Sequence, residues 1–326
     1  MKIWSLQLLR FFAALAVVIY HADWEIFHAT HRFGVLGLNG AMLGQAGVDI
    51  FFVLSGVVIA TSSKGLTARA FAIKRATRIL PLYAAIAVLY LAARLFAGTL
   101  GWREAVSTVF LWPALDRMTD PVVPVAWTLC FEVLFYSGTA LVLWRPRLAW
   151  LLAAIFAGAM STQSWPITRF IGSPLILEFL VGVGLTRLPK TGSGIVFIPV
   201  GLALLWLFGS EGYPTTSGAL NGEMVWQRAL YFGLPAAMIV WGTLQLSARK
   251  GLLSYLGDTS YALYLTHVPV VIAITQILCH WTTLPADLVA VAATAASVIV
   301  GWRVHEVIEK PLLAWVRRPA TQPALA

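Results

Sequence analysis

The chain has 326 residues, of which 59% are hydrophobic and only 11% are charged. A water-soluble protein of this length could not cover its surface with so few polar side chains, so the composition indicates a polytopic membrane protein. A net charge of +9 would suggest a nucleic-acid partner for a soluble protein, but in a membrane protein it is explained by loop topology. No nucleic-acid partner is therefore expected.

Hydropathy predicts an all-α bundle of about ten transmembrane helices. The apolar segments are continuous rather than alternating, which excludes a membrane β-barrel. Residues 1–326 are expected to form a single membrane domain with no appended soluble domain. The expected spans lie at residues 4–21, 43–61, 79–99, 127–144, 148–162, 174–188, 195–209, 226–246, 259–278 and 285–305.

The distribution of Lys and Arg predicts that both termini are cytoplasmic. With the N-terminus inside, the inner loops and the termini hold fifteen of these residues, and the outer loops hold five. This asymmetry is the positive-inside pattern of multi-pass membrane proteins. The five outer residues are Arg32, Arg103, Arg117, Arg169 and Arg228.

Two polar residues lie on one face of the first expected span. Arg10 and His21 are eleven residues apart, which is about three helical turns and about 16 Å along the axis. A full positive charge in lipid costs at least about 2.5 kcal/mol, so Arg10 should face a protein interior or a polar cavity. This face is expected to form one wall of a continuous polar passage between Arg10 and His21.

Other ionisable residues lie at membrane depth in later spans. Asp49, Glu132 and Glu178 are each expected a turn or two inside the outer end of a span, and His267 near the middle of another. Buried ionisable residues at such depths are candidates for function. The simplest alternative is that the acids form structural ion pairs and that His267 is a hydrogen-bonded core residue.

Three cations at the inner mouth of the third span form a second cluster. Arg75 and Arg78 are three residues apart and share a helical face, which suits the binding of phosphate groups. Lys74 lies beside them, and its simplest role is that of a charge that fixes orientation. The histidine spacings do not match a zinc site, so no metal is expected.

Six motifs occur in one order along the chain. Together they resemble the acyltransferase-3 family of bacterial membrane O-acyltransferases, and within it the branch that modifies exopolysaccharides. The motifs are Arg10-x10-His21, Gly47-Val-Asp-Ile-Phe-Phe-Val-Leu-Ser-Gly56, Arg75-x-x-Arg78-Ile-x-Pro81, Ala126-Trp-Thr-Leu-Cys-Phe-Glu132-Val-Leu-Phe-Tyr136, Leu256-Gly-Asp-x-Ser-Tyr-x-Leu-Tyr-Leu-x-His267-x-Pro269 and Glu306-x-x-Glu309-Lys-Pro311.

The resemblance implies a reaction in the bacterial inner membrane. An acyl group, usually acetyl, would pass from cytoplasmic acyl-CoA to a hydroxyl of a surface polysaccharide or of its lipid-linked precursor. The implied partners are membrane lipid, acyl-CoA as co-substrate and the saccharide acceptor. The oligomeric state and any association with polysaccharide-assembly proteins stay open.

His21 is the expected general base, or the residue that transiently carries the acyl group. Arg10 would stabilise a thioester oxygen or hold the donor. Asp49 or Glu132 would orient His21 by accepting its other ring N–H, and the sequence does not decide between the two acids.

Arg75 and Arg78, together with Lys74, are the expected ligands of the donor phosphates. The acceptor is expected to meet four residues, namely Glu132, Trp127, Tyr136 and His267. The alternative function is a transporter or flippase for a lipid-linked saccharide, which would also need intramembrane charges. Such transporters often contain internal repeats with broken helices, and no repeat is evident in this chain.

Overall fold

The computed structural model describes residues 3–32, 42–209, 218, 220, 222, 224–247, 249 and 251–317. Apart from one isolated antiparallel bridge, the regular structure within these residues is helical. The elements in chain order are α1 (Trp4–Thr30), α3 (Ala46–Ser62), α4 (Ala68–Phe96), α5 (Trp102–Phe110), α6 (Trp127–Trp144), α7 (Leu148–Thr162), α8 (Pro166–Ile171), α9 (Leu175–Leu185), the 3₁₀ turn η1 (Ser193–Val196), α10 (Phe197–Phe208), α12 (Val225–Arg228), the π-helical turn η3 (Ala229–Gly233), α13 (Leu234–Leu244), α14 (Leu252–Trp281), α15 (Ala286–Val304), the π-helical turn η4 (His305–Glu309) and α16 (Lys310–Val316).

Six of the described helices are long and apolar enough to cross a membrane. Three further apolar helices are shorter, at Ala46–Ser62, Leu148–Thr162 and Ser193–Phe208. The all-α prediction is therefore confirmed for the described residues, whereas the predicted count of ten spans is not reached by this criterion. The six long helices lie at Trp4–Thr30, Ala68–Phe96, Trp127–Trp144, Pro166–Leu185, Ser254–Trp281 and Ala286–Val316.

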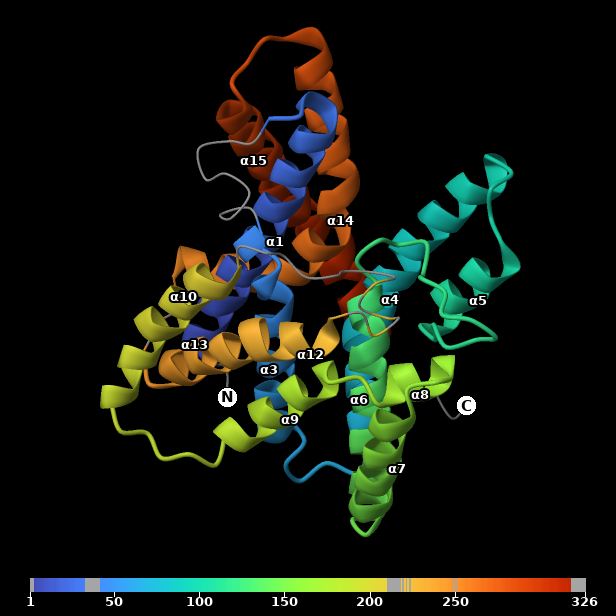
Figure 1. Cartoon of the computed structure of the whole chain (residues 1–326), viewed down its shortest axis with the longest axis vertical. Helices are drawn as coiled ribbons and strands as arrows, with labels where there is room; N and C mark the ends of the chain where they lie inside the picture. The colour runs from blue at the N-terminus through green and yellow to red at the C-terminus, as the bar shows by residue number, and fades with distance from the viewer. Residues whose placement is uncertain are drawn as a thin grey trace, which may run out of the picture.

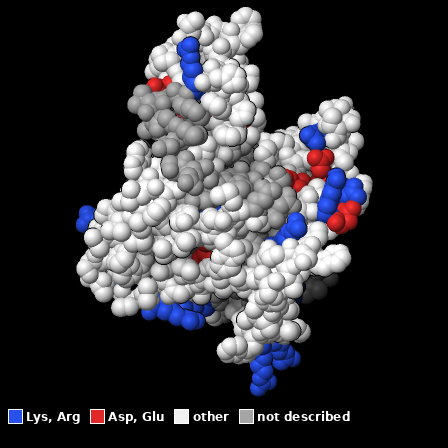
Figure 2. Space-filling view, in the orientation of Figure 1, with Lys and Arg blue, Asp and Glu red and all other residues white. Residues whose placement is uncertain are grey.

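The outer surface of the bundle is rich in large apolar side chains. Phe96 is 90% exposed, Trp150 83% and Trp281 78%. Figure 2 shows that uncharged residues cover most of the visible face, while Lys and Arg gather along its lower edge. The turn between α6 and α7, which carries Arg145 and Arg147, lies at this edge (Figure 1). Such a surface suits a lipid environment.

The helices associate in neighbouring groups around α1 and α3. Helices α1, α14 and α15 pack together in the upper part of Figure 1, and α3 lies beside α1 and against α9. Helix α10 packs on α13, and α4 packs on α6. Residues from α1, α3, α4, α6 and α14 thereby meet in the interior, although they are far apart in sequence.

Two glycines allow the closest of these helix contacts. A Cβ on Gly257 of α14 would overlap the backbone of Gln7 on α1, and a Cβ on Gly56 of α3 would overlap the carbonyl of Phe179 on α9. Small residues of this kind let helices approach closely in membranes. Gly257 therefore fixes α14 against the helix that carries Arg10 and His21.

Helix α1 is longer than the sequence predicts. The expected span ends at His21, but the helix continues to Thr30, and His31 then adopts a left-handed conformation with φ of 56°. Ala22 and Ile26 are fully buried, so apolar packing extends the helix past the predicted end. His21 is consequently a residue of the helix interior rather than of a loop boundary.

The long loop between α4 and α6 folds back against the bundle. The Tyr83 hydroxyl of α4 donates a 2.7 Å hydrogen bond to the Thr108 carbonyl of α5, and Val123 is fully buried. At the surface of this loop, Arg103 Nε donates a 2.8 Å hydrogen bond to Asp116 Oδ1. This hydrogen bond lowers the pKa of Asp116 to about 2.

The position of Arg228 differs from the one assumed when Lys and Arg residues were counted in the inner and outer loops. Arg228 is expected in an outer loop, but its side chain is fully buried and pairs with Asp49 of α3. The ion pair supplies the reason, because a buried guanidinium is tolerated when a carboxylate compensates its charge. Lys2, Lys250 and Arg318, which also entered the charge count, lie outside the described residues.

Candidate active site

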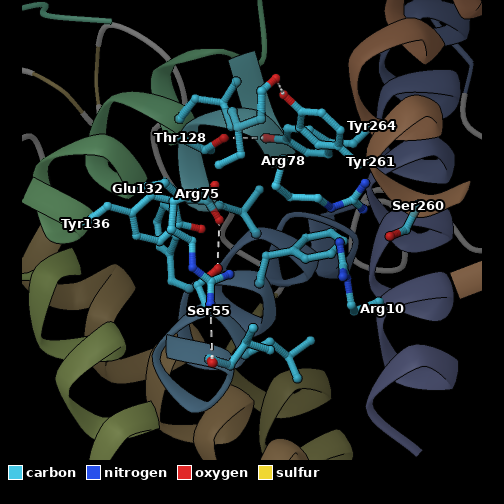
Figure 3. A pocket seen from close by; sticks show the side chains of 17 residues that line it. Arg10, Ser55, Arg75, Arg78, Thr128, Glu132, Tyr136, Ser260, Tyr261 and Tyr264 are labelled. Atoms are coloured by element: carbon cyan, nitrogen blue, oxygen red, sulfur yellow. Dashed lines mark hydrogen bonds between the residues drawn. The ribbon is translucent and has the colours of Figure 1, made fainter. Parts of the chain in front are cut away.

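A cavity lies where five helices meet. Its volume of about 110 Å³ is enough for several water molecules. Figure 3 shows Arg10 and Ser260 on one side, with Glu132 and Tyr136 opposite them. The lining residues are Arg10 of α1; Val48, Phe51, Phe52, Leu54, Ser55 and Val58 of α3; Arg75, Arg78 and Ile79 of α4; Thr128, Leu129, Glu132 and Tyr136 of α6; and Ser260, Tyr261 and Tyr264 of α14.

Three arginines face this cavity, and each has a different set of partners. Arg78 forms an ion pair with Glu309 of η4, and its guanidinium lies over the Tyr261 ring at 5.6 Å. Arg75 donates a hydrogen bond to Ser62 Oγ and is 5.6 Å from the Tyr136 ring centroid. The two predicted phosphate ligands therefore line one cavity, as their spacing on α4 indicates.

Arg10 is the least compensated of the three. No hydrogen bond or ion pair holds its guanidinium among the described residues, although Glu132 lines the same cavity. Arg75 Nε and Ser260 Oγ are buried in the cavity wall, and neither has a partner in the described part of the chain. Buried donors without partners cost about 1–3 kcal/mol each, so they point to water or to a ligand in the cavity.

Glu132 projects into the cavity from α6. Its Oε1 accepts a 2.7 Å hydrogen bond from Ser55 Oγ of α3. Tyr136, one turn further along α6, lines the same wall. Two of the three α6 residues predicted to contact the acceptor, Glu132 and Tyr136, therefore reach the cavity.

The two predicted histidines lie together beyond one end of the cavity. His267 Nε2 is 3.2 Å from His21 Nδ1, and the ring centroids are 4.9 Å apart. His267 is fully buried, and His21 is partly exposed. The sequence predicted that His267 contacts the acceptor. Its contact with His21 could not be predicted, because the two residues are 246 positions apart in the chain.

The described lining of the cavity does not include either histidine. Tyr264 lines the cavity, and its ring is 5.9 Å from that of His267. Phe51, which also lines the cavity, packs against Tyr264 at 5.8 Å. The described cavity therefore reaches Tyr264 but neither histidine, and it does not form the expected continuous passage from Arg10 to His21.

Asp49 has a different environment from the one expected. Its Oδ2 accepts a 2.6 Å hydrogen bond from Arg228 Nη2, and its Oδ1 a 3.1 Å bond from Arg228 Nε. Among the described residues, no hydrogen bond joins His21 to Asp49 or to Glu132. The structure therefore offers neither carboxylate as the group that orients His21.

Two further predicted residues lie away from the cavity. Lys74, a predicted donor ligand, is exposed on α4 and does not line the cavity. Trp127 is only 3% exposed and packs edge-on against Phe52 and Phe131. The Arg228 guanidinium also lies over its ring at 5.7 Å, so the position of Trp127 is that of a core residue.

The cavity wall also contains hydroxyl groups that were not predicted from the sequence as site residues. Ser55 binds Glu132, and Thr128 Oγ1 lies 3.0 Å from the Tyr264 hydroxyl. Two features of the sequence could have identified these hydroxyl residues as site candidates. They are polar residues within apolar helices, and they lie inside the motifs quoted above. Within the described residues, no group of three His, Cys, Asp or Glu side chains is arranged as metal ligands would be.

Such a site can hold an anion or a carbonyl oxygen at membrane depth. Guanidinium groups in a water-poor cavity stabilise negative charge more strongly than they would in bulk water. The neighbouring imidazole pair supplies ring nitrogens that can accept a hydrogen bond or a proton.

Comparison with known proteins agrees with this chemistry. The model of the acyltransferase-3 family, described as an acyltransferase domain, matches residues 3–303. Similar proteins include the exopolysaccharide production protein ExoZ of Rhizobium meliloti (strain 1021), 28% identical over 88% of this chain and 94% of that protein. They also include the acyltransferase MdmB of Streptomyces mycarofaciens, 27% identical over 98% of this chain and 94% of that protein. No solved structure gives a significant match.

Proposed function

The chain belongs to the acyltransferase-3 family, and from this membership we propose that it acylates a saccharide hydroxyl at the bacterial inner membrane. The donor is acyl-CoA, with acetyl as the first acyl group to test. The acceptor is a sugar of an exopolysaccharide or of its lipid-linked precursor, because one similar protein is named for exopolysaccharide production. The observation that carries the proposal is the arginine cavity with unpartnered buried donors beside the histidine pair.

The arginines of the cavity bind the donor. Arg75 and Arg78 carry the positive charge that complements CoA phosphates, and Arg75 keeps an unused N–H. Arg10 has no carboxylate bound to it and is placed to stabilise the oxyanion that develops on the thioester carbonyl. Both roles need the cavity to open toward the cytoplasm, as the expected orientation of the N-terminus implies.

His21 accepts the proton of the attacking hydroxyl. The hydroxyl oxygen forms a bond to the thioester carbonyl carbon, the C–S bond breaks, and the proton passes through His21 to the CoA thiolate. General-base assistance of this kind contributes about 10²–10⁴-fold in rate. An acyl-His21 intermediate is the two-step version of the same reaction. In either version the Phe51 and Tyr264 side chains have to move so that the acyl group reaches His21.

Loss and complementation of the gene test the proposal. Mass spectrometry of the surface polysaccharide should show an O-acyl mass increment with the native chain and none with His21→Ala at equal amounts of membrane protein. The matched control is His280→Ala, an exposed histidine on α14, which should retain the increment. Undiminished acylation by His21→Ala, or the same acylation without the gene, would overturn the proposal.

Thiol release distinguishes the transferase from a lipid-linked saccharide transporter. Purified native protein with acetyl-CoA should liberate free CoA thiol, slowly with water and faster with a saccharide acceptor. A transporter would translocate the lipid-linked sugar without consuming acetyl-CoA.

A further inference from the structure

The hydrogen-bond pattern of the two histidines assigns their tautomers. We propose that His267 is a positioning residue, which holds His21 with its proton on Nδ1 and leaves His21 Nε2 as the free base. This inference rests on the proposed function only for its catalytic consequence, because the tautomer itself can be measured without any reaction.

The proton on His267 is located by two backbone carbonyls. His267 Nδ1 lies 2.8 Å from the Tyr264 carbonyl oxygen and 3.2 Å from that of Leu263. Carbonyl oxygens only accept hydrogen bonds, so Nδ1 must carry the proton. In the neutral ring, which full burial favours, Nε2 is then left with a lone pair and can only accept.

The same reasoning locates the proton on His21. Its Nδ1 lies 2.9 Å from the Val17 carbonyl oxygen and 3.2 Å from His267 Nε2. Both of these neighbours are acceptors, so the His21 Nδ1 atom is the donor and shares its proton between them. The remaining nitrogen of His21, Nε2, is therefore the lone-pair site on the partly exposed side chain.

This arrangement replaces the carboxylate that the sequence analysis expected. In a Ser-His-Asp triad an acid accepts the Nδ1 proton, fixes the tautomer and stabilises the imidazolium. Here Asp49 is occupied by Arg228, and Glu132 accepts a hydrogen bond from Ser55. The His267 imidazole and the Val17 carbonyl instead accept the hydrogen bond from His21 Nδ1 and so fix the tautomer of His21, without adding a buried negative charge.

The positions of both rings depend on the packing of α1 against α14. The close approach at Gly257 sets the distance between these helices, and Ala14 and Leu263 pack in one small buried cluster between them. His267 is thus held by its own helix through two carbonyls, while His21 is held through Val17 and His267. Hydrogen bonds thus connect the α14 backbone through His267 to Nδ1 of His21 on α1.

Replacement of His267 tests the assignment kinetically. His267→Leu removes the acceptor and should lower kcat by about 10²-fold or more, with less than a two-fold change in KM for acetyl-CoA, because the tautomer of a base is a kcat effect. His267→Gln keeps an acceptor oxygen near the Nε2 position and should recover part of the loss. His280→Gln on the same helix is the control and should leave both constants unchanged.

Nitrogen-15 NMR of histidine-labelled protein in lipid nanodiscs gives a readout that needs no activity. The signals of His21 and His267 are identified by their loss in the single variants. In the native protein His21 should show a protonated Nδ1 and an unprotonated Nε2, and in His267→Leu it should show a mixture of tautomers. A His21 protonated at Nε2 in the native protein, or a tautomer unchanged by loss of His267, would overturn the proposal even if the protein proves to be an acyltransferase. The expected tautomers in a protein that transfers no acyl group would refute the proposed function and leave this assignment standing.

Discussion

Two groups of opposite charges lie inside the bundle, and they differ in what surrounds them. The first is the Arg10 cavity, in which Arg10, Arg75 and Glu132 face open space. The second is the closed pair of Asp49 and Arg228, in which both side chains are fully buried and bound to each other. Both groups consist of arginine and carboxylate, so residue type alone does not distinguish them.

The difference lies in partners and access. In the closed pair, two hydrogen bonds join the guanidinium to the carboxylate, and a third reaches the Gln45 carbonyl. In the cavity, Arg10 has no bound partner among the described residues, and Arg75 Nε is unused. Of these two arginine groups, the one whose hydrogen-bonding capacity is left unfilled is the one with room to bind a ligand.

The largest effect is expected from breaking the closed pair. Arg228→Leu leaves the Asp49 carboxylate buried without its counter-charge, which should reduce the free energy of unfolding by about 3–5 kcal/mol. The double variant Arg228→Leu with Asp49→Leu should recover much of that loss. Equilibrium unfolding in mixed micelles measures both, and equal instability of the single and double variants would contradict a structural role.

Arg10→Gln should affect activity rather than stability. We expect kcat/KM for acetyl transfer to fall by about 10²–10³-fold, the usual cost of losing one oxyanion donor. The unfolding free energy should change by less than about 1 kcal/mol, because no described partner is lost. Arg303→Gln, which changes an exposed arginine on α15, is the control. A severe loss of stability in Arg10→Gln would place Arg10 with the closed pair instead.

The α4 cluster should show a smaller and more specific effect. Arg75→Gln should raise KM for acyl-CoA by about ten-fold, since a charge-assisted hydrogen bond is worth about 1.5–3 kcal/mol. Arg78→Gln should have a weaker effect on KM, because Glu309 already neutralises part of the Arg78 charge. Lys74→Gln on the exposed face of the same helix should leave KM unchanged, and an equal rise in all three variants would refute the specific assignment.

The smallest effect is expected at the exposed pair in the loop between α4 and α6. Because Arg103 lowers the pKa of Asp116 to about 2, the pair contributes stability above the unfolded pKa of about 3.9 and loses it as pH falls toward 2. Limited proteolysis of this loop should therefore increase below about pH 4 in the native protein. In Arg103→Gln the increase in proteolysis between pH 4 and pH 2 should be absent or much smaller than in the native protein, and an undiminished increase would contradict this cause.

The sequence predicted the parts of this molecule that depend on local pattern. Apolar runs located helices in every expected segment. The spacing of Arg75 and Arg78 predicted a shared helical face, and both side chains line the cavity. Arg10 also lies where the cost of charge in lipid requires it, facing a cavity. These inferences need only helix periodicity and the free energy of burying a charge.

The remaining features depend on which helices become neighbours, and local pattern does not contain that information. Asp49 and Arg228 are separated by 179 residues, and His21 and His267 by 246. The expected depths of Asp49 and Glu132 allowed either acid to orient His21. In the structure, helix packing instead pairs Asp49 with Arg228 and places His267 beside His21. Trp127 was a reasonable stacking candidate by type, and only its burial among aromatic rings shows it to be core.

Direct measurement of acetyl-CoA binding to the purified protein in lipid nanodiscs tests the central distinction between the open cavity and the closed pair. The native chain and the folded double variant Arg228→Leu with Asp49→Leu should bind with similar Kd. Arg10→Gln combined with Arg75→Gln should bind at least ten-fold more weakly. Native affinity in the cavity variant, or equal loss of affinity in both variants, would contradict the account.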